Sequence, residues 1–527
     1  MALLVQLLSA SLVVCTTATL ALIIRARKRS LKFLQGPPSP SFLLGYEWDL
    51  MRMRKIGDLE YKWFEQYGSV FRFTGCFRED ILEIADPRAL QHICHKSAYR
   101  YKKPKDIEQR AVKLFGPGLV TVNGDVHERQ RKIMNPIFSA AQIRPFAPVF
   151  ESCAQKVIAK WKSEIEGGAT VIDCYGPLHG MTLDALGEAM FEYNFDATGK
   201  SRAKGLWDVF REVFIDSGNP TKLKMLRDAS YRFLPKPIID LISLKKAKED
   251  KRFANWLTAS QKVAERLINQ KVESGGGQEK DRDILSIIAR SLAAEDPSKR
   301  LFPVEALSQM ALNWLLCELS YNSKWQDRLI QEIQDIRRQN GTNGPLTVND
   351  LEDMPVLNAT IKETLRFHPI VAELVRESET DDIIPLECPI NDISGSVLRE
   401  IPVTKGQRVV LNIFKYNRLK TVWGEDAEVW NPERFLGSNL STTLGVFANL
   451  MTFSGGIRAC IGWRFAPCVS SVLELQVVAV ALIEFFKFSA VDGIEIEHVR
   501  VVTSPPMVKG RWEAGPQLPL KVALRSA

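Results

Sequence analysis

Two short stretches of the chain alternate apolar and polar residues, SVFRFTG at residues 69–75 and DILEIAD at residues 80–86. Because successive side chains of a strand point to opposite faces, this alternation predicts two paired strands. Asp86 and Pro87 then indicate the start of a helix, since aspartate is a good N-cap and proline fits the first helical position.

Further along, apolar residues recur at the three- and four-residue spacing of helices. This spacing predominates from Ala140 to Ile336, most clearly at residues 253–272 and 283–295. Stretches typical of strands return at residues 385–392, 407–414 and 518–524. The order of these elements predicts an α+β fold that is mainly α with minor β, built as a single large helical domain with small sheets.

The N-terminus differs from the rest of the chain. Residues 1–24 are apolar and uncharged, which is long enough to cross a bilayer as a helix. A cluster of basic residues begins at Arg25, after the apolar run rather than before it, so the run predicts a retained anchor and not a cleaved signal peptide. We expect a transmembrane anchor at 1–24, a basic and Pro-rich linker at 25–45, and a body at 46–527 on the cytosolic side.

Composition narrows the choice of partners. The chain has 527 residues and a net charge of +8, spread without a basic patch, so it does not suggest a nucleic-acid partner. Its nine cysteines show no paired spacing, which favours a reducing compartment over a disulfide framework. No break in composition supports more than one domain in the body.

One cysteine stands in an unusual setting. Cys460 lies in FSGGIRACIGWRFA, residues 453–466, between glycines that permit close backbone approach, and two residues after Arg458, a donor for carboxylate or phosphate. Taken alone, the cysteine can equally be a buried free thiol.

Three other segments carry charges at suggestive spacings. Glu363 and Arg366 lie three apart on one helix, Arg434 lies in the proline-bounded NPERF, and His127 and Arg131 lie four apart on another helix. Each of these is an ordinary surface feature when it is considered alone.

In this order, E-x-x-R, P-E-R-F and F-x-x-G-x-R-x-C-x-G resemble the cytochrome P450 family of haem-thiolate monooxygenases. Five residues match the fixed positions of the cysteine motif: Phe453, Gly456, Arg458, Cys460 and Gly462. LFGPGLVTVNGDVHERQRK and EAGPQLPLKV are similar to fungal membrane-bound members. The resemblance implies the cytochrome P450 fold and haem b, iron protoporphyrin IX, as cofactor.

The resemblance also implies a role for each residue. Cys460 is expected to be the axial thiolate ligand of the iron, which favours O–O cleavage. The expected contacts of the haem propionates are His127, Arg131, Arg376 and Arg458. Glu363, Arg366 and Arg434 are expected to form a buried structural ion network that does not touch substrate.

The family implies the oxidation of a lipophilic small molecule by O₂, in secondary metabolism. Its electrons are expected from NADPH-cytochrome P450 reductase. The corresponding location is the endoplasmic reticulum membrane, with a single-pass anchor and a cytosolic catalytic domain.

The chain departs from the family in its central helix. Relatives have a glycine, an acid and a threonine there, and the last two deliver protons to oxygen. Here VEALSQM runs directly into ALNWLLCELS, so these residues are absent and the segment is shorter than the roughly 30 residues that such a helix needs. We expect a segment to be missing between Met310 and Ala311, as in a defective or mis-spliced isoform. The alternative is a haem-thiolate isomerase or dehydratase that does not need O₂.

Overall fold

The structure is a computed structural model. It describes residues 31–525 except 53–54, 117, 136–137, 192, 194, 196, 198–219, 235–247, 274–305, 342–345, 438–443, 463–469 and 502. The predicted anchor at 1–24 and the helix predicted at 283–295 lie outside the described residues. Among the described residues, no helix is long and apolar enough to span a bilayer.

The strands form one larger sheet and three small ones. β1 (Val70–Thr74) and β2 (Asp80–Ile84) pair antiparallel as predicted, and the five-stranded sheet has the order β1-β2-β8-β5-β3. Its other strands are β3 (Tyr101–Lys102), β5 (Glu373–Ser378) and β8 (Arg408–Asn412). A three-stranded sheet has the order β4 (Val171–Asp173), β12 (Pro519–Leu524), β9 (Phe486–Ala490). Two further sheets have two strands each: β6 (Asp382–Asn391) with β7 (Val397–Val403), and β10 (Ile496–His498) with β11 (Pro506–Val508).

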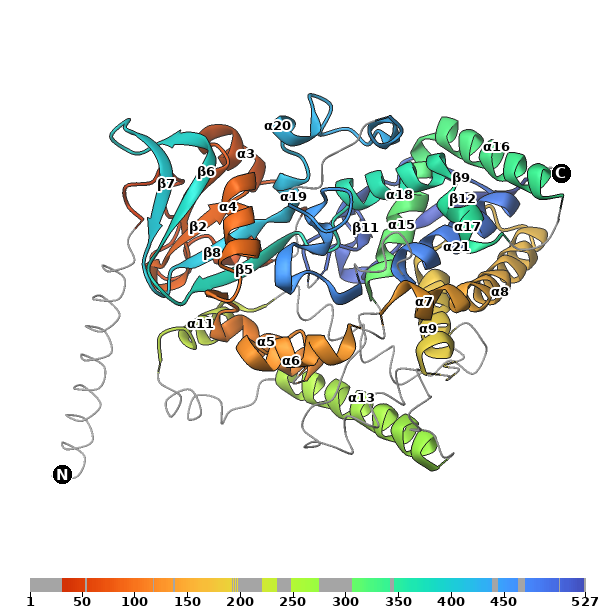
Figure 1. The fold of residues 1–527 in the computed structure, drawn as a ribbon, viewed down its shortest axis with the longest axis horizontal. Helices are drawn as coiled ribbons and strands as arrows, with labels where there is room; N and C mark the ends of the chain where they lie inside the picture. The colour runs from red at the N-terminus through yellow and green to blue at the C-terminus, as the bar shows by residue number, and fades with distance from the viewer. Residues whose placement is uncertain are drawn as a thin grey trace.

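The five-stranded sheet, together with β6 and β7, lies at one end of the molecule, and a group of long helices fills the other end (Figure 1). α4 (Pro87–Gln91) begins as predicted, because the Asp86 side chain accepts a hydrogen bond from the Ala89 N–H. α2 (Glu47–Met51) and α3 (Glu60–Tyr67) pack against the sheet. Along the lower side of the molecule in Figure 1, from the sheet end toward the helical end, lie α11 (Lys222–Ser230), α5 (Lys105–Phe115), α6 (Gly124–Met134) and α13 (Lys248–Glu273).

Four helices form the core of the helical end: α8 (Ala147–Glu166), α9 (Tyr175–Phe191), α15 (Ala306–Tyr321) and α21 (Ser470–Phe485). Their inner faces carry large buried residues, such as Trp161 and Trp314, so burial of apolar surface holds the bundle together. The remaining helices are α7 (Ala140–Ile143), α16 (Ser323–Asn340), α17 (Val348–Glu352), α18 (Pro355–Phe367), α19 (Ile413–Tyr416) and α20 (Lys420–Trp423).

The central helix is short over the part that the structure describes. α15 has 16 residues, about 24 Å of helix, and its sequence contains neither threonine nor glycine. Its single acid, Glu318, is hydrogen-bonded to the imidazole of His368 at 2.6 Å. The motif that is absent from the sequence is therefore not replaced by a free acid within α15.

Candidate haem-thiolate site

The cysteine loop follows α20 and precedes α21. The turns Met451–Phe453 and Gly456–Arg458 fold the chain back, so that the Cys460 N–H donates a hydrogen bond to the Phe453 carbonyl at 2.9 Å. Cys460 is partly buried against the main apolar core. A Cβ on Gly462 would lie 3.7 Å from the Cys460 Sγ atom, so the sulfur faces the chain that leaves the loop.

Gly456 has two reasons to be glycine. Its φ is +65°, and a Cβ there would lie 2.0 Å from the Cys94 carbonyl oxygen. A Cβ on the neighbouring Gly455 would lie 2.7 Å from the His95 Nε2 atom. Both glycines therefore let the loop pack closely on the turn at residues 92–96, which fixes the position of the cysteine relative to the sheet.

The four residues expected to contact the propionates come from three different elements, and the structure brings them together. His127 and Arg131 lie on α6, Arg376 on β5, and Arg458 in the cysteine loop. The Arg131 guanidinium donates to the carbonyl of Ala459, directly before Cys460. Arg376 and His127 are buried, at 8% and 4% exposure.

The basic groups of this cluster repel one another. Burial, followed by the charges of Arg458, Lys103, Arg131 and Arg376, lowers the pKa of His127 to about 3. Burial likewise lowers the pKa of Arg376 to about 10, with Arg458 adding to the shift. His127 is therefore a neutral imidazole at physiological pH, and it can donate one N–H.

The sequence patterns did not single out Tyr99 and Lys103, which complete the cluster. The Tyr99 hydroxyl lies 3.5 Å from the His127 Nδ1 atom, and the Arg458 guanidinium lies over the Tyr99 ring at 5.2 Å. Burial, then Arg376 and Arg458, lowers the pKa of Lys103 to about 7. Only the pairing of β3 with β5 reveals this placement, because residue spacing alone does not relate Lys103 to Arg376.

The cluster fits a bound dianion. The Arg458 Nη1 and Nη2 atoms are buried and have no hydrogen-bond partner among the residues that the structure describes, although the Arg458 Nε atom donates to the Ala98 carbonyl at 3.5 Å. A buried guanidinium without a partner is costly, so an anionic ligand is expected to satisfy it. The two propionates of a haem would match the charge and the donor set of these residues, and Cys460 would supply the ligand of its iron.

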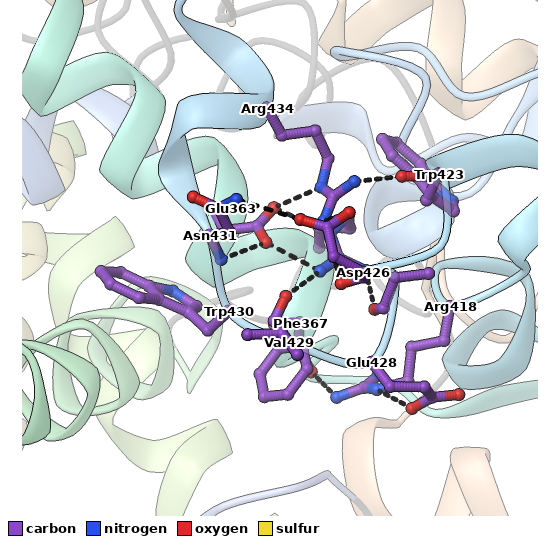
Figure 2. A network of polar contacts seen from close by, with 12 residues as sticks. Glu363, Phe367, Arg418, Trp423, Asp426, Glu428, Val429, Trp430, Asn431 and Arg434 are labelled. Atoms are coloured by element: carbon purple, nitrogen blue, oxygen red, sulfur yellow. Dashed lines mark hydrogen bonds and ion pairs between the residues drawn. The ribbon is translucent and has the colours of Figure 1, made fainter.

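A separate group of charges braces the loop from the opposite side. The Glu363 carboxylate accepts two hydrogen bonds from Arg366, at 2.7 and 2.8 Å, and both side chains are fully buried. Arg434 lies 3.5 Å from the same carboxylate, and the Asn431 N–H donates to it at 2.8 Å. Figure 2 shows the Arg434 side chain and the backbone N–H of Asn431 pointing toward the Glu363 carboxylate. The interpretation of Glu363 and Arg366 as an ordinary surface ion pair, which their spacing alone would allow, is therefore wrong, because neither side chain is exposed to solvent.

The network is connected to the cysteine loop. Arg366 also donates to the carbonyls of Asn417 and Ala427 at 2.6 and 2.7 Å, so it holds the long loop after α19. The buried Asn417 side chain in turn donates to Thr452 at 2.9 Å and accepts from the Met451 N–H at 3.1 Å. One chain of hydrogen bonds thus links α18 to the start of the turn that leads to Cys460.

The other cysteines have different surroundings. Burial raises the pKa values of Cys94 and Cys153 to about 11, which keeps both as thiols. Cys388 is exposed on β6, and Cys468, expected to be inert, lies outside the described residues. None of the cysteines that the structure describes forms a disulfide bond, and Cys460 is the one in the glycine-bounded loop beside the basic cluster.

A protein-family model described as Cytochrome P450 matches residues 35–299 and 307–507 of this chain. Similar proteins include cytochrome P450 monooxygenase 205 of Postia placenta, 30% identical over 98% of this chain and 97% of its own length. Cytochrome P450 monooxygenase 128 of the same fungus is 31% identical over 93% of this chain and 92% of its length. A ganoderic acid synthetase of Ganoderma lucidum is 29% identical over 93% of each chain.

These matches bear on the short central helix. The family match is interrupted at residues 300–306, the last of which is the first residue of α15. The alignment with monooxygenase 205 has 557 positions whereas this chain has 527 residues, so it leaves at least 30 gaps in this chain. The relatives therefore contain residues that this chain lacks.

Proposed function

Because this chain belongs to the cytochrome P450 family, we propose that it is a membrane-bound haem-thiolate monooxygenase that oxidises a lipophilic small molecule. The chain is a cytochrome P450 monooxygenase, an oxidoreductase with a haem iron cofactor. The form of the haem, the electron donor, the substrate class and the membrane location are our proposals. The observation that carries the proposed binding of haem is the basic cluster beside Cys460, in which two buried nitrogens of the Arg458 guanidinium have no hydrogen-bond partner among the described residues.

The residues of the chain have separable tasks in this proposal. Cys460 supplies the thiolate, while Arg131, Arg376 and Arg458 bind the two carboxylates of haem b and so fix its rotation in the site. His127 donates a neutral N–H to one of them. When bound, the haem iron with its thiolate ligand supplies the activation of O₂. The Glu363–Arg366–Arg434 network keeps the loop in place and takes no part in the chemistry.

A membrane location is supported by the surface on the side of α2 and α11. Phe42, Leu43 and Leu223 are exposed at 70%, 47% and 79%. Their segments pack together through a small apolar cluster that includes Met225 and Trp48. The Lys222 ammonium lies over the Trp48 ring at 5.4 Å, so apolar and basic groups alternate there as at a lipid interface. We propose that this face and the anchor at 1–24 hold the body on the cytosolic side of the endoplasmic reticulum membrane.

Electrons come from outside the chain in this proposal, by way of NADPH-cytochrome P450 reductase. The lipophilic substrate class agrees with attachment to a membrane. The relative from Ganoderma lucidum is named a ganoderic acid synthetase, and by analogy we place this chain in the secondary metabolism of hydrophobic compounds.

A second candidate function has one specific observation in its favour. α15 contains no threonine, and its acid Glu318 is held by His368. A haem-thiolate isomerase or dehydratase rearranges an oxygenated substrate and does not need a proton path to O₂. This candidate explains the absent threonine but not the absent length of the helix.

The two functions are separated by their electron requirement. Purified full-length protein with the reductase and NADPH should turn over a hydrophobic substrate only when O₂ and NADPH are both present. Turnover of an oxygenated substrate in the absence of NADPH would favour the isomerase instead.

A further inference from the structure

A cavity of about 60 Å³ lies between α2, α5, α11 and α13. None of the residues that line it belongs to the basic cluster or to the cysteine loop. The cavity has room for more than one water molecule, but it is far smaller than the roughly 300–1,000 Å³ of a pocket that encloses a whole drug-sized ligand. It can therefore hold one small polar group rather than a complete lipophilic molecule.

The acids around this cavity already have basic partners. Four acids of the described chain line it: Glu47, Asp106, Asp228 and Asp250. Arg232 donates hydrogen bonds to the first two, at 2.6 and 2.8 Å. Arg227 donates to the other two, at 3.2 and 3.0 Å. Each carboxylate is therefore neutralised by an arginine.

The cavity also contains a guanidinium without such a partner. Arg110 on α5 lines the cavity and is half-buried, and within the described residues no hydrogen bond or ion pair joins it to another side chain. Burial lowers the pKa of Arg110 below its usual value, although the charges of Asp106 and Asp228 oppose this shift. A partly desolvated guanidinium without an acceptor is costly, and a bound oxyanion would satisfy it.

The apolar wall of the cavity adjoins the face that we propose to contact the membrane. Met51 and Met225 line the cavity, and both pack in the apolar cluster that also contains Trp48. Leu223, which is 79% exposed, lies two residues before Met225 on α11. A membrane lipid can offer both an anionic group for the cavity and apolar chains for this face.

We propose that the cavity binds the phosphodiester of an anionic membrane lipid, and that Arg110 is the residue that binds the phosphate oxygens. This inference rests on the proposed function, because it takes the face beside α2 and α11 as the one that contacts the membrane. A phosphodiester carries a single negative charge, which balances the one charge of Arg110. The bound lipid then links α5 to the membrane surface.

The test is isothermal titration calorimetry of the full-length protein in neutral detergent with dihexanoylphosphatidylglycerol, kept below its micelle concentration. The wild type should bind this lipid, and Arg110→Gln should bind at least about tenfold more weakly, because a charge-assisted hydrogen bond is missing. The matched control is Lys105→Gln. Lys105 is exposed on the same helix and does not line the cavity, so this variant should bind as the wild type.

Thermal unfolding separates this contact from damage to the fold. Without lipid, Arg110→Gln should be as stable as the wild type, because the replaced charge has no partner. With lipid, the unfolding temperature of the wild type and of Lys105→Gln should rise, and that of Arg110→Gln should not.

Two further ligands identify the chemistry that the cavity recognises. Dihexanoylphosphatidylcholine has the same chains but carries a compensating cation, so it should bind at least about tenfold more weakly than the anionic lipid. sn-Glycerol 3-phosphate has a phosphate without chains. If it bound as tightly as the anionic lipid, the cavity would be a site for free phosphate, which would overturn the assignment to a lipid.

Two other outcomes separate this inference from the proposed function. Equal affinity of the wild type and Arg110→Gln for dihexanoylphosphatidylglycerol would overturn the assignment of the cavity and leave the proposed function intact. Full-length protein that remains in the soluble fraction after cell lysis would overturn the membrane location and this inference with it.

Discussion

At the scale of single residues, two groups of buried charge behave in opposite ways. Glu363 receives hydrogen bonds from Arg366 and from the Asn431 backbone, so that group is complete without a ligand. Within the described part of the chain, two buried nitrogens of Arg458 have no hydrogen-bond partner, so the basic cluster is incomplete without a ligand. The first group should therefore determine whether the chain folds, and the second should determine whether it retains haem.

Replacing Glu363 with glutamine should destabilise the fold, because Arg366 would be left as a buried cation without a carboxylate. The expected loss in free energy of unfolding is about 3–5 kcal/mol. It can be measured by urea denaturation of the full-length protein. Glu433→Gln is the control, since Glu433 is 53% exposed in its ion pair with Arg328 and should contribute at most about 1 kcal/mol. A Glu363 variant as stable as the control would contradict the structural role of the network.

His179 should make stability depend on pH. Burial lowers its pKa from 6.5 to about 4, and its Nδ1 atom bonds the Gln309 side chain at 2.8 Å. Between pH 6.5 and pH 4, His179 is protonated in the unfolded chain but stays neutral in the folded chain. The contribution of His179 to the free energy of unfolding is therefore complete above pH 6.5 and is lost as the pH falls toward 4.

The loss attributable to His179 amounts to about 2 kcal/mol at pH 5. His179→Gln should therefore lose about 2 kcal/mol less than the wild type between pH 7 and pH 5 in urea denaturation. Parallel stability curves for the two proteins would show that His179 titrates normally in the folded state.

At the scale of elements, the cysteine loop is positioned from two sides. The glycines at 455 and 456 pack on the turn before β3, and Asn417 links the loop to α18. Ser454 in this loop has a φ of +60°, which is unusual for a residue with a side chain. Its shape therefore depends on its neighbours.

Asn417→Ala should loosen the loop while the helices stay folded. It removes the acceptor of the Met451 N–H and the donor to Thr452, at an expected cost of about 1–3 kcal/mol. Thermal unfolding should shift down, and haem should be lost faster to an excess of apomyoglobin. Asn349→Ala is the control. Asn349 is exposed, and within the described residues its side chain accepts a hydrogen bond from the Arg144 guanidinium. Equal haem loss from both variants would remove Asn417 from the positioning of the loop.

Local patterns in the sequence predicted the elements where one physical rule dominates. The β1–β2 pair follows from alternation, and the start of α4 follows from Asp86 and Pro87. Cys460 and Arg458 were identified as site residues only through the resemblance of their motif to a family. The spacing of residues around Cys460 was equally compatible with a buried thiol that has no function. Lys103 and Asn417 were not predictable, since their roles come from strand register and from a contact between segments 34 or more residues apart.

At the scale of the whole molecule, the short α15 is the main departure from the relatives. The described part of the helix packs in the bundle with Trp314 stacked on His368 at 4.2 Å, so its C-terminal half is well anchored. The alignment with monooxygenase 205 leaves gaps in this chain, and α15 itself has no threonine and a single acid, Glu318, which is hydrogen-bonded to His368. We expect haem binding to survive this loss better than the coupling of electron use to product.

Inserting the central-helix segment of monooxygenase 205 between Met310 and Ala311 should raise this coupling. In reconstituted assays with the reductase, the unmodified chain should release most of its electrons as hydrogen peroxide, and the insertion variant should release several-fold less per NADPH consumed. Insertion of a polyalanine segment of equal length is the control for helix length alone. Equal coupling in all three proteins would show that the shortened helix is harmless.

The central claim is that Cys460 is the thiolate ligand of a haem. The most direct test is the difference spectrum of the reduced full-length protein with and without carbon monoxide. The wild type and Cys468→Ser should both show the band of a thiolate-ligated haem, and Cys460→Ser should lose that band. A thiolate band that persists in Cys460→Ser, or that is absent from a haem-loaded wild type, would contradict the claim.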